Sequence, residues 1–451
     1  MYDFDVVFIG SGHSCWHGAL MLVQAGKKVA LVDHDLPGGT CTNYGCDAKI
    51  LLDGPFEFAE GLERYNGLCV EQNVTIDWKK LMDYKRKVLS PFPEMLAGMF
   101  KQWGFTFIRE KGKIIDAHTV QAGDKKISTE YIVIGTGQRN ARLDIPGKEY
   151  LHGSREFLDI EEFPDNLICI GAGIISMEFA SMALMLGKKV TFIEFASRPL
   201  LAYPEKYVSK LVDKMTAQGT KFYCGEAVNG VEKVENGYKV TTKSGLSVEG
   251  SYVLDATGRI ANYEELGLEE LGIAASRRGI VVDDHLRTSV KNIFASGDVV
   301  DKKIPKLTPT AIFESNYIAG QILGRSDAPI CYPVIPNLVF TLPRIGQVGV
   351  TIEDAEKNPA QYKIHSIPYG VQNEWVDNRE LDIDITLIVD SEGYLAGATI
   401  YGSEAGTWLD FLTLIINKKI TGQELDNMIF AFPTQTFMIA SMLIPILKKA
   451  E

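Results

Sequence analysis

The chain has 451 residues, a length that typically corresponds to about three domains. Hydrophobic residues make up 46% of it and charged residues 23%, which is the composition of an ordinary globular protein. Its 46 basic and 58 acidic residues give a net charge of −12. A negative surface repels nucleic-acid backbones and anionic lipids, so we expect neither a nucleic-acid nor a membrane partner.

The seven cysteines are too few for a disulfide-stabilised secreted protein of this size. The N-terminus lacks basic residues and is apolar only over residues 6–9, which argues against a signal peptide. The longest strongly apolar segment, residues 437–447, contains Pro445 and is too short to cross a bilayer. We therefore expect a cytoplasmic protein.

The first informative motif is a buried strand followed by a glycine-rich turn, a helix and a second strand. The strands are expected at residues 6–9 and 29–32, and a helix at 16–25 lies between them. Gly10-Ser11-Gly12 forms the turn, and Asp33 follows the second strand. In such a motif the first glycine allows a tight turn, and the second lets the backbone approach a pyrophosphate. The acid accepts hydrogen bonds from ribose hydroxyls. The pattern predicts a dinucleotide site.

The same motif occurs a second time with the same spacing. Strands are expected at residues 167–170 and 190–193, Gly171-Ala172-Gly173 forms the turn, and Glu194 follows the second strand. In both copies the acid lies the same number of residues after the first glycine. One such motif is a weak signal, but two matching copies predict two dinucleotide sites.

The acid of the second copy bears on the choice of nicotinamide nucleotide. The Glu194 carboxylate would accept hydrogen bonds from a free ribose and repel the 2′-phosphate of NADPH. Arg198 lies four residues further on and could offset this repulsion. We predict NADH as the preferred nucleotide, with NADPH as the alternative.

Two cysteines follow the first motif, in the segment Gly39-Thr40-Cys41-Thr42-Asn43-Tyr44-Gly45-Cys46-Asp47-Ala48-Lys49. On a regular helix, Cα atoms five residues apart are separated by about 8–9 Å, whereas a disulfide needs about 4.4–6.8 Å. Cys41 and Cys46 can therefore pair only if the helix is irregular, and Gly45 supplies that freedom. The following helix N-terminus and Lys49 would lower the pKa of a thiol here. Two ordinary loop cysteines or half of a metal site remain the alternatives, although the sequence lacks a second cysteine pair.

The segment around Cys41 and Cys46 resembles the FAD-dependent pyridine nucleotide–disulfide oxidoreductases of the glutathione reductase and dihydrolipoamide dehydrogenase type. Further blocks resemble this family in the same order along the chain. They are Ile134-Gly135-Thr136-Gly137, Ala256-Thr257-Gly258-Arg259-Ile260-Ala261-Asn262, Phe294-Ala295-Ser296-Gly297-Asp298, Leu307-Thr308-Pro309 and residues 340–349. The resemblance implies an α/β fold with two dinucleotide-binding three-layer domains and a C-terminal α+β dimerisation domain.

The resemblance also implies where the domains begin and end. The FAD-binding domain would occupy residues 1–146 and the NAD(P)-binding domain residues 147–261. A return segment of the FAD and central region would span 262–329, and the interface domain 330–451. The family forms homodimers, so the substrate pocket would lie between two subunits.

In the family, hydride passes from NADH to FAD, and electrons then reach a redox-active disulfide. The resemblance implies that Cys46 forms the thiolate beside the flavin and that Cys41 exchanges with the substrate. Lys49 and Glu178 would form an ion pair near the flavin, and Ala48 replaces the family's usual proline. No metal is implied. The implied cofactor-binding residues are Gly10, Gly12, Asp33, Gly39, Thr40, Gly135, Thr136, Gly137, Asp298, Gly171, Gly173, Glu194 and Gly258.

The family's C-terminal His-Pro-Thr-x-x-Glu motif is altered in this chain. The matching segment is Phe432-Pro433-Thr434-Gln435-Thr436-Phe437, so phenylalanine replaces both the His base and the Glu that orients it. A general base typically contributes a factor of about 10²–10⁴ to the rate. Two interpretations are open: Phe432 and Phe437 add packing at the dimer interface, or they form an apolar substrate pocket beside the partner's cysteine.

Three functions compete on this basis. The first is reduction of a small-molecule disulfide or oxidised thiol. The second is the same electron path to a non-disulfide acceptor, such as an oxidant, a metal ion or a thioether. It resembles the ketopropyl-coenzyme M reductase/carboxylase branch, where Phe also replaces the His. The third is a non-enzymatic FAD-holding subunit of a larger complex, and two nucleotide motifs plus a cysteine pair argue against it.

Overall fold

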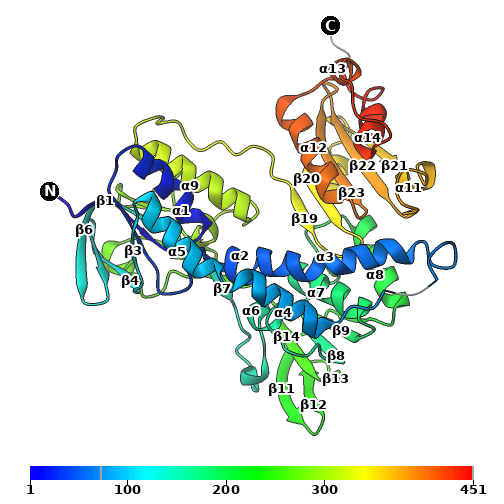
Figure 1. The fold of residues 1–451 in the computed structure, drawn as a ribbon, viewed down its shortest axis with the longest axis horizontal. Coiled ribbons are helices and arrows are strands. Elements are labelled where there is room, and N and C mark those ends of the chain that lie inside the picture. Colours follow the sequence, from blue (N-terminus) through cyan, green and yellow to red (C-terminus); the bar gives the residue numbers. More distant parts are fainter. Residues whose placement is uncertain (72–73, 449–451) are drawn as a thin grey trace.

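The computed structural model describes residues 1–71 and 74–448 (Figure 1). Its first sheet is built around β1 (Phe4–Ile9), which pairs in parallel with β2 (Val29–Val32) and with β6 (Lys125–Ile134). Beyond β2 lies β3 (Thr106–Ile108), also parallel. All of β2 and the last four residues of β1 are buried, as expected for apolar strands that are covered on both faces.

The return of the chain to this sheet places distant segments side by side. β18 (Ile293–Ala295) pairs in parallel with β6, with Ala295 opposite Ile134, and Ile134 is also opposite Ile9. The turns that follow β1, β6 and β18 therefore meet at one edge of the sheet. From β6 the sheet continues to the antiparallel strands β5 (Thr119–Ala122) and β4 (Gly112–Asp116).

Helix α1 (His13–Gln24) packs closely on α9 (Thr308–Ile322) beside this sheet (Figure 1). A Cβ on Gly18 would lie only 2.4 Å from the carbonyl oxygen of Ser315, so glycine permits the close approach. Helix α1 starts three residues before the predicted residue 16. Its first turn is polar and carries no apolar periodicity, so the hydrophobic pattern begins only at Trp16.

The second dinucleotide motif lies in a separate parallel sheet of four strands. Its order is β10 (Lys221–Cys224), β9 (Lys189–Glu194), β8 (Asn166–Ile170) and β14 (Tyr252–Asp255). An antiparallel three-stranded sheet accompanies it, formed by β11 (Val228–Val234), β12 (Gly237–Thr242) and β13 (Ser247–Gly250). The helices of this region are α6 (Ser154–Phe157), α7 (Ile174–Met185) and α8 (Glu205–Ala217).

The two nucleotide regions are joined by a two-stranded antiparallel crossing of β7 (Gln138–Asn140) and β15 (Arg259–Ala261). Beside it, the Thr136 hydroxyl donates to the carbonyl oxygen of Asn262 over 2.5 Å. The Asn262 side-chain amide donates to the carbonyl oxygen of Thr136 over 2.9 Å. These reciprocal bonds fix the path of both crossing strands.

The C-terminal region is an antiparallel sheet of five strands flanked by helices. Its order is β19 (Asn337–Val339), β20 (Ile345–Gly349), β23 (Leu395–Tyr401), β22 (Asp384–Asp390) and β21 (Tyr362–Ile367). The helices are α10 (Ile352–Lys357), α11 (Tyr369–Gln372), α12 (Ala405–Lys418), α13 (Gly422–Asp426) and α14 (Gln435–Leu443).

Helix α3 (Cys46–Glu63) links all three regions and runs from the first sheet to beneath the C-terminal sheet (Figure 1). Leu52 and Phe56 on α3 belong to one hydrophobic core with residues of α7 and of the C-terminal region. Asp53 of α3 forms a buried ion pair with Arg344 over 2.6 Å. The remaining elements are α2 (Gly39–Tyr44), α4 (Trp78–Leu89), α5 (Phe92–Trp103), β16 (Ala275–Ser276), β17 (Gly279–Ile280) and three short 3₁₀ turns, η1 (Lys148–Tyr150), η2 (Glu269–Leu271) and η3 (Gly297–Val299).

The mixed α/β architecture agrees with the predicted fold class. We propose residues 146, 261 and 329 as the domain boundaries. Within the part of the chain that the structure describes, no helix is both long and apolar enough to span a bilayer.

Candidate active site

The first glycine-rich turn has the geometry of a phosphate-binding turn. Gly10 has a φ of +119°, and a Cβ there would lie 2.5 Å from the carbonyl oxygen of Gly135. Gly12 precedes α1, and no side chain caps that helix, so the N–H groups of its first turn are available to a phosphate. The backbone N–H and the hydroxyl of Ser11 both donate to Asp33, over 2.8 and 2.7 Å.

The second turn repeats this arrangement. Gly171 has a φ of +91°, and a Cβ there would lie 2.7 Å from the carbonyl oxygen of Ala256. The backbone N–H of Ala172 donates to Glu194, as that of Ser11 does to Asp33. A Cβ on Gly173 would meet no atom within 4 Å, so open space lies in front of this second turn.

The residues at the edge of the first sheet fit a flavin dinucleotide. Asp298 follows β18 in η3, and none of the described residues makes a hydrogen bond or ion pair with its carboxylate, which leaves it free to accept from a hydroxyl. A Cβ on Gly135 would lie 2.3 Å from the sulfur of Cys15, and Gly39 has a φ of +68°, so both positions favour glycine. Thr40 is the second residue of α2.

The remaining cofactor positions lie at the crossing strands. Gly137 accepts a backbone hydrogen bond from Asn262 over 2.9 Å, and Gly258 accepts one from Ala141 over 3.1 Å. Both glycines have positive φ angles, +66° and +145°, and a Cβ on either would meet no atom within 4 Å. The structure thus brings Gly137 and Gly258 to the junction of the two nucleotide regions.

The segment between the two cysteines is an interrupted helix. Helix α2 ends at Tyr44, Gly45 adopts φ −134° and ψ −115°, and α3 begins at Cys46. This is the irregularity that a Cys41–Cys46 pairing requires. Both cysteines are free thiols in this structure.

The two thiols are electrostatically different. The hydrogen bond from Cys41 lowers the pKa of Cys46 to about 6, with further help from Thr308 and Lys49 against partial burial. The Thr308 hydroxyl lies 3.7 Å from the Cys46 sulfur. Donation to Cys46 and burial raise the pKa of Cys41. Near neutral pH, Cys46 is therefore a thiolate and Cys41 a protonated thiol.

An ion pair joins the start of α3 to α7. Lys49 Nζ lies 3.0 Å from Glu178 Oε1, and Glu178 is 4% exposed. Burial raises the pKa of Glu178, and Lys49 and the backbone N–H of Phe340 oppose that shift. The Phe340 N–H donates to Glu178 over 2.9 Å, and the Lys49 ammonium lies 3.8 Å from the Phe340 ring centroid. Cys41, Cys46, Lys49 and Glu178 thus belong to one site.

A second anchor of the cysteine segment was not predicted from the sequence. The Tyr44 hydroxyl donates to Asp35, and the Arg155 guanidinium lies 3.7 Å from the Tyr44 ring centroid. Arg155 also pairs with Asp35 over 3.0 Å. No sequence motif links these residues, because Arg155 lies in the second nucleotide region and reaches Tyr44 only through the tertiary fold.

Phe432 and Phe437 contact each other on the C-terminal region. Their ring centroids are 5.1 Å apart, and Phe432 is 66% exposed and contacts Trp375 over 6.1 Å. No hydrogen bond or ring contact among the described residues joins either phenylalanine to the cysteines of the same chain. Asp377, close to this surface, is buried, and burial raises its pKa to about 7.

The Arg198 side chain is held by the backbone around it. Its guanidinium donates to the backbone carbonyl oxygens of four nearby residues, over 3.0–3.3 Å. These residues are Pro199, Leu200, Leu201 and Tyr203. The side chain therefore stabilises the loop that follows Glu194.

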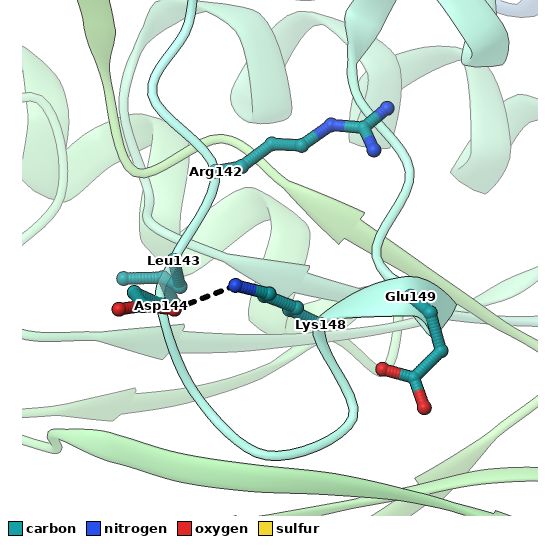
Figure 2. Close-up of a pocket in the computed structure, with 5 residues that line it drawn as sticks. All are labelled: Arg142, Leu143, Asp144, Lys148 and Glu149. Atoms are coloured by element: carbon teal, nitrogen blue, oxygen red, sulfur yellow. Dashed lines mark hydrogen bonds and ion pairs between the residues drawn. The ribbon is translucent and has the colours of Figure 1, made fainter.

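A surface pocket of about 580 Å³ lies where the chain enters the second nucleotide region (Figure 2). Asp144 and Lys148 form an ion pair across it over 2.7 Å. Its other lining residues are Arg142, Leu143 and Glu149. None of these belongs to the predicted site, so we assign it no function. Among the described residues, no group of three or more His, Cys, Asp or Glu side chains is arranged to hold a metal ion.

Comparison with known families decides the assignment. Residues 4–315 match the pyridine nucleotide-disulphide oxidoreductase family model, and residues 335–442 match the dimerisation domain of the same family. The chain belongs to the pyridine nucleotide-disulphide oxidoreductase family. It is a flavoprotein oxidoreductase of the NAD(P)H:disulfide type, and the family depends on FAD and NAD(P)H.

Similar proteins span almost the whole chain. Dihydrolipoyl dehydrogenases from Geobacillus stearothermophilus and Chlamydia muridarum are 28% and 29% identical, over 96% of this chain and 94% of theirs. The HOCl-induced flavoprotein disulfide reductase RclA from Escherichia coli has a similar fold. It matches with a TM-score of 0.86 at 23% identity, over 98% of this chain and 99% of that one. A Cu(II) complex of a Cys-to-Ser mutant of RclA matches with a TM-score of 0.88 at 23% identity, over 99% of this chain and 100% of that one.

Proposed function

We propose that this protein transfers electrons from NADH through FAD to the Cys41–Cys46 pair, and from there to a small-molecule disulfide or oxidised thiol. The observation that carries the proposal is the placement of the pair, because α2 breaks at Gly45, α3 begins at Cys46, and the Lys49–Glu178 ion pair lies in the first turn after it. Cys46 has a pKa lowered to about 6, and Cys41 keeps its proton. Cys46 would therefore remain a thiolate, and Cys41 would be the sulfur that exchanges with the substrate.

FAD, when bound, accepts hydride from the nicotinamide and delivers two electrons to the disulfide. The uncapped N-terminus of α1 and the free Asp298 carboxylate would hold it. Lys49, fixed by Glu178, holds positive charge beside the Cys46 thiolate. Cys41 then attacks a substrate disulfide, forming a mixed disulfide and releasing one thiol. Cys46 attacks the Cys41 sulfur, releases the second thiol and restores the Cys41–Cys46 disulfide.

Two observations support NADH as the nucleotide. Glu194 accepts the backbone N–H of Ala172, just as Asp33 accepts that of Ser11 in the first copy. In this position the carboxylate would contact a free ribose. Arg198 is occupied by backbone carbonyls and does not offset the repulsion of a 2′-phosphate. We propose that Glu194 makes NADPH the poorer substrate.

We also propose a cytoplasmic homodimer. Three apolar side chains of α3, eight and then four residues apart, are exposed: Ile50, Phe58 and Leu62 are 45%, 78% and 44% exposed. The exposed Phe432 and the match to a dimerisation domain support the same assembly. In it, the partner subunit would cover the cysteines.

An anaerobic NADH titration of the purified yellow protein tests this function. After two electrons, a long-wavelength absorbance band from the Cys46 thiolate should appear while the main flavin absorbance persists. If the flavin bleaches directly and no such band forms, the cysteine pair is bypassed and the proposal fails.

One observation favours a second candidate, a non-disulfide acceptor such as an oxidant, a metal ion or a thioether. Phe432, which is exposed, offers no base to the exchange reaction. The solved Cu(II) complex of RclA suggests copper as the first metal to try. NADH oxidation with Cu(II) that exceeds the rate with every disulfide, and that is lost in Cys41→Ser, would favour this candidate.

A further inference from the structure

Glu314 is a fully buried carboxylate that no part of the proposed function uses. It lies on α9 at 0% exposure, and Lys302 pairs with its charge over 2.5 Å. Its Oε2 atom accepts the backbone N–H of Gly297 over 2.6 Å, and its Oε1 atom accepts the Tyr332 hydroxyl over 2.7 Å. The carboxylate thus has a donor on each oxygen, and one of these donors belongs to the backbone of the predicted flavin site.

The bond to Gly297 holds the turn that carries Asp298. Gly297 directly precedes Asp298, and both residues lie in η3. Gly297 has a φ of +76°, and a Cβ there would lie 2.7 Å from the Cβ of Ser14 in the first turn of α1. The turn is therefore packed against the helix whose N-terminus would hold the FAD pyrophosphate, and the direction of the Asp298 carboxylate depends on what fixes this backbone.

Lys306 holds the same turn from its other end. The Lys306 ammonium donates to the carbonyl oxygen of Asp298 and to that of Arg278, over 2.7 Å each. One N–H of the turn is thus bound by an anion and one C=O by a cation, and hydrogen bonds to charged groups are the stronger ones. Both contacts are to the backbone, so they fix the turn and leave the Asp298 carboxylate open to a ligand.

Stability alone is a weak reason for a buried pair such as Glu314 and Lys302. Desolvation of two charges offsets most of their attraction, and well-packed apolar residues of similar volume often stabilise a protein as well or better. An apolar pair, however, could not accept the Gly297 N–H. This contact is therefore what the carboxylate adds to the site.

We propose that Glu314 is a positioning residue for FAD, because by accepting the Gly297 N–H it fixes η3 so that the Asp298 carboxylate faces the flavin ribitol. Lys306 fixes the other end of the turn for the same purpose. A ligand group that is already in place has less to lose in ordering when FAD binds, so the affinity for FAD rises. The inference rests on the FAD site of the proposed function and adds no step to its electron transfer.

The test compares two double variants of the full-length protein that both remove the buried charges. In Glu314→Gln/Lys302→Met, the amide oxygen still accepts the Gly297 N–H. In Glu314→Leu/Lys302→Met, this N–H has no acceptor on α9. The Kd for FAD, measured by flavin fluorescence on dilution of the holoenzyme, should stay within about threefold of wild type in the first variant and rise by about tenfold in the second, as the loss of one hydrogen bond predicts.

ADP gives a readout that distinguishes positioning from general damage. It lacks the ribitol and would contact only Asp33 and the first glycine-rich turn. Its Kd, measured from its competition with FAD for the FAD-stripped full-length protein, should be the same in wild type and in both double variants. A loss confined to FAD is the signature of a displaced ribitol ligand, whereas a damaged α1 or first sheet would weaken both nucleotides.

Two further comparisons locate the effect at Asp298. In an Asp298→Ala background, Glu314→Leu/Lys302→Met should cost no further FAD affinity, because the group that it positions is already absent. Lys306→Met should weaken FAD and spare ADP. Lys303→Met, which removes an exposed lysine from the same segment, should change neither.

The outcomes separate this inference from the proposed function. Equal FAD affinity in the two double variants, an equal loss of ADP affinity, or a further loss in the Asp298→Ala background would each overturn the role of Glu314 while the wild type still binds FAD. If the wild-type protein binds no FAD, the proposed function itself fails and the inference falls with it.

Discussion

Lys49 Nζ lies 3.0 Å from Glu178 Oε1, and this contact ties the helix that starts at Cys46 to the helix of the second dinucleotide turn. Both side chains are largely removed from water, at 20% and 4% exposure. The pair thus links the cysteine site to the nicotinamide region through one interaction. Its loss should affect stability as well as chemistry.

Lys49→Met should lower the free energy of unfolding by about 3 kcal/mol, because it leaves the Glu178 carboxylate buried without its counter-charge, held only by the Phe340 N–H. The additional change Glu178→Leu should recover most of that loss, since it removes the stranded charge. Urea unfolding measures both. Lys148→Met, which breaks the exposed pair with Asp144, should cost about 0–1 kcal/mol. Equal costs for Lys49→Met and Lys148→Met would contradict the structural role of the buried pair.

The pH dependence of the Cys46 thiolate follows from its pKa. Because that pKa is lowered to about 6, the long-wavelength band of the two-electron-reduced protein should be present above pH 6 and disappear as the thiolate gains a proton below it. Thr308→Val removes a hydrogen-bond donor to the sulfur, so the midpoint should rise by about one pH unit. A spectrophotometric pH titration measures the shift. An unchanged midpoint would mean that Thr308 does not stabilise the thiolate.

Nucleotide preference should depend on Glu194. Glu194→Ala should raise the KM for NADH by roughly tenfold, which corresponds to the loss of hydrogen bonds to a charged acceptor. The KM for NADPH should change less. Arg198→Lys serves as the control, since its guanidinium contacts backbone carbonyls and should not alter the NADH to NADPH ratio. Equal losses for both nucleotides with Glu194→Ala would refute the NADH assignment.

Two features of the site could be predicted from sequence because they depend on local geometry. The paired acids Asp33 and Glu194 follow strands of predictable position, and each accepts the N–H of the residue after the first glycine. The interruption at Gly45 follows from the distance that two cysteines five residues apart must span. In both cases the spacing along the chain determines the spacing in the structure.

Other features depend on contacts between distant segments and left no signal in the sequence. Arg198 lies near Glu194 along the chain, and its sequence position could not show that it turns to backbone carbonyls. Arg155 reaches Tyr44 from another nucleotide region. Burial and side-chain direction are set by the tertiary fold.

The missing base can be restored by substitution. Phe432→His together with Phe437→Glu recreates the family's base and its orienting acid, and should raise the turnover of hydroxyethyl disulfide by about 10-fold or more, part of the usual contribution of a general base. Ile429→His places an imidazole on a fully exposed neighbour and should have no effect. Steady-state NADH oxidation measures the change. No gain from the double variant would show that the phenylalanines do not occupy the position of the base.

The most direct measurement of the central claim is the visible spectrum of two oxidised single-cysteine variants. If Cys46 is the thiolate beside the flavin and Cys41 the exchanging thiol, Cys41→Ser should show the long-wavelength band permanently, without NADH, because Cys46 can no longer form the disulfide. Cys46→Ser should show no such band in any redox state. Identical spectra for the two variants, or a band in Cys46→Ser alone, would contradict the account.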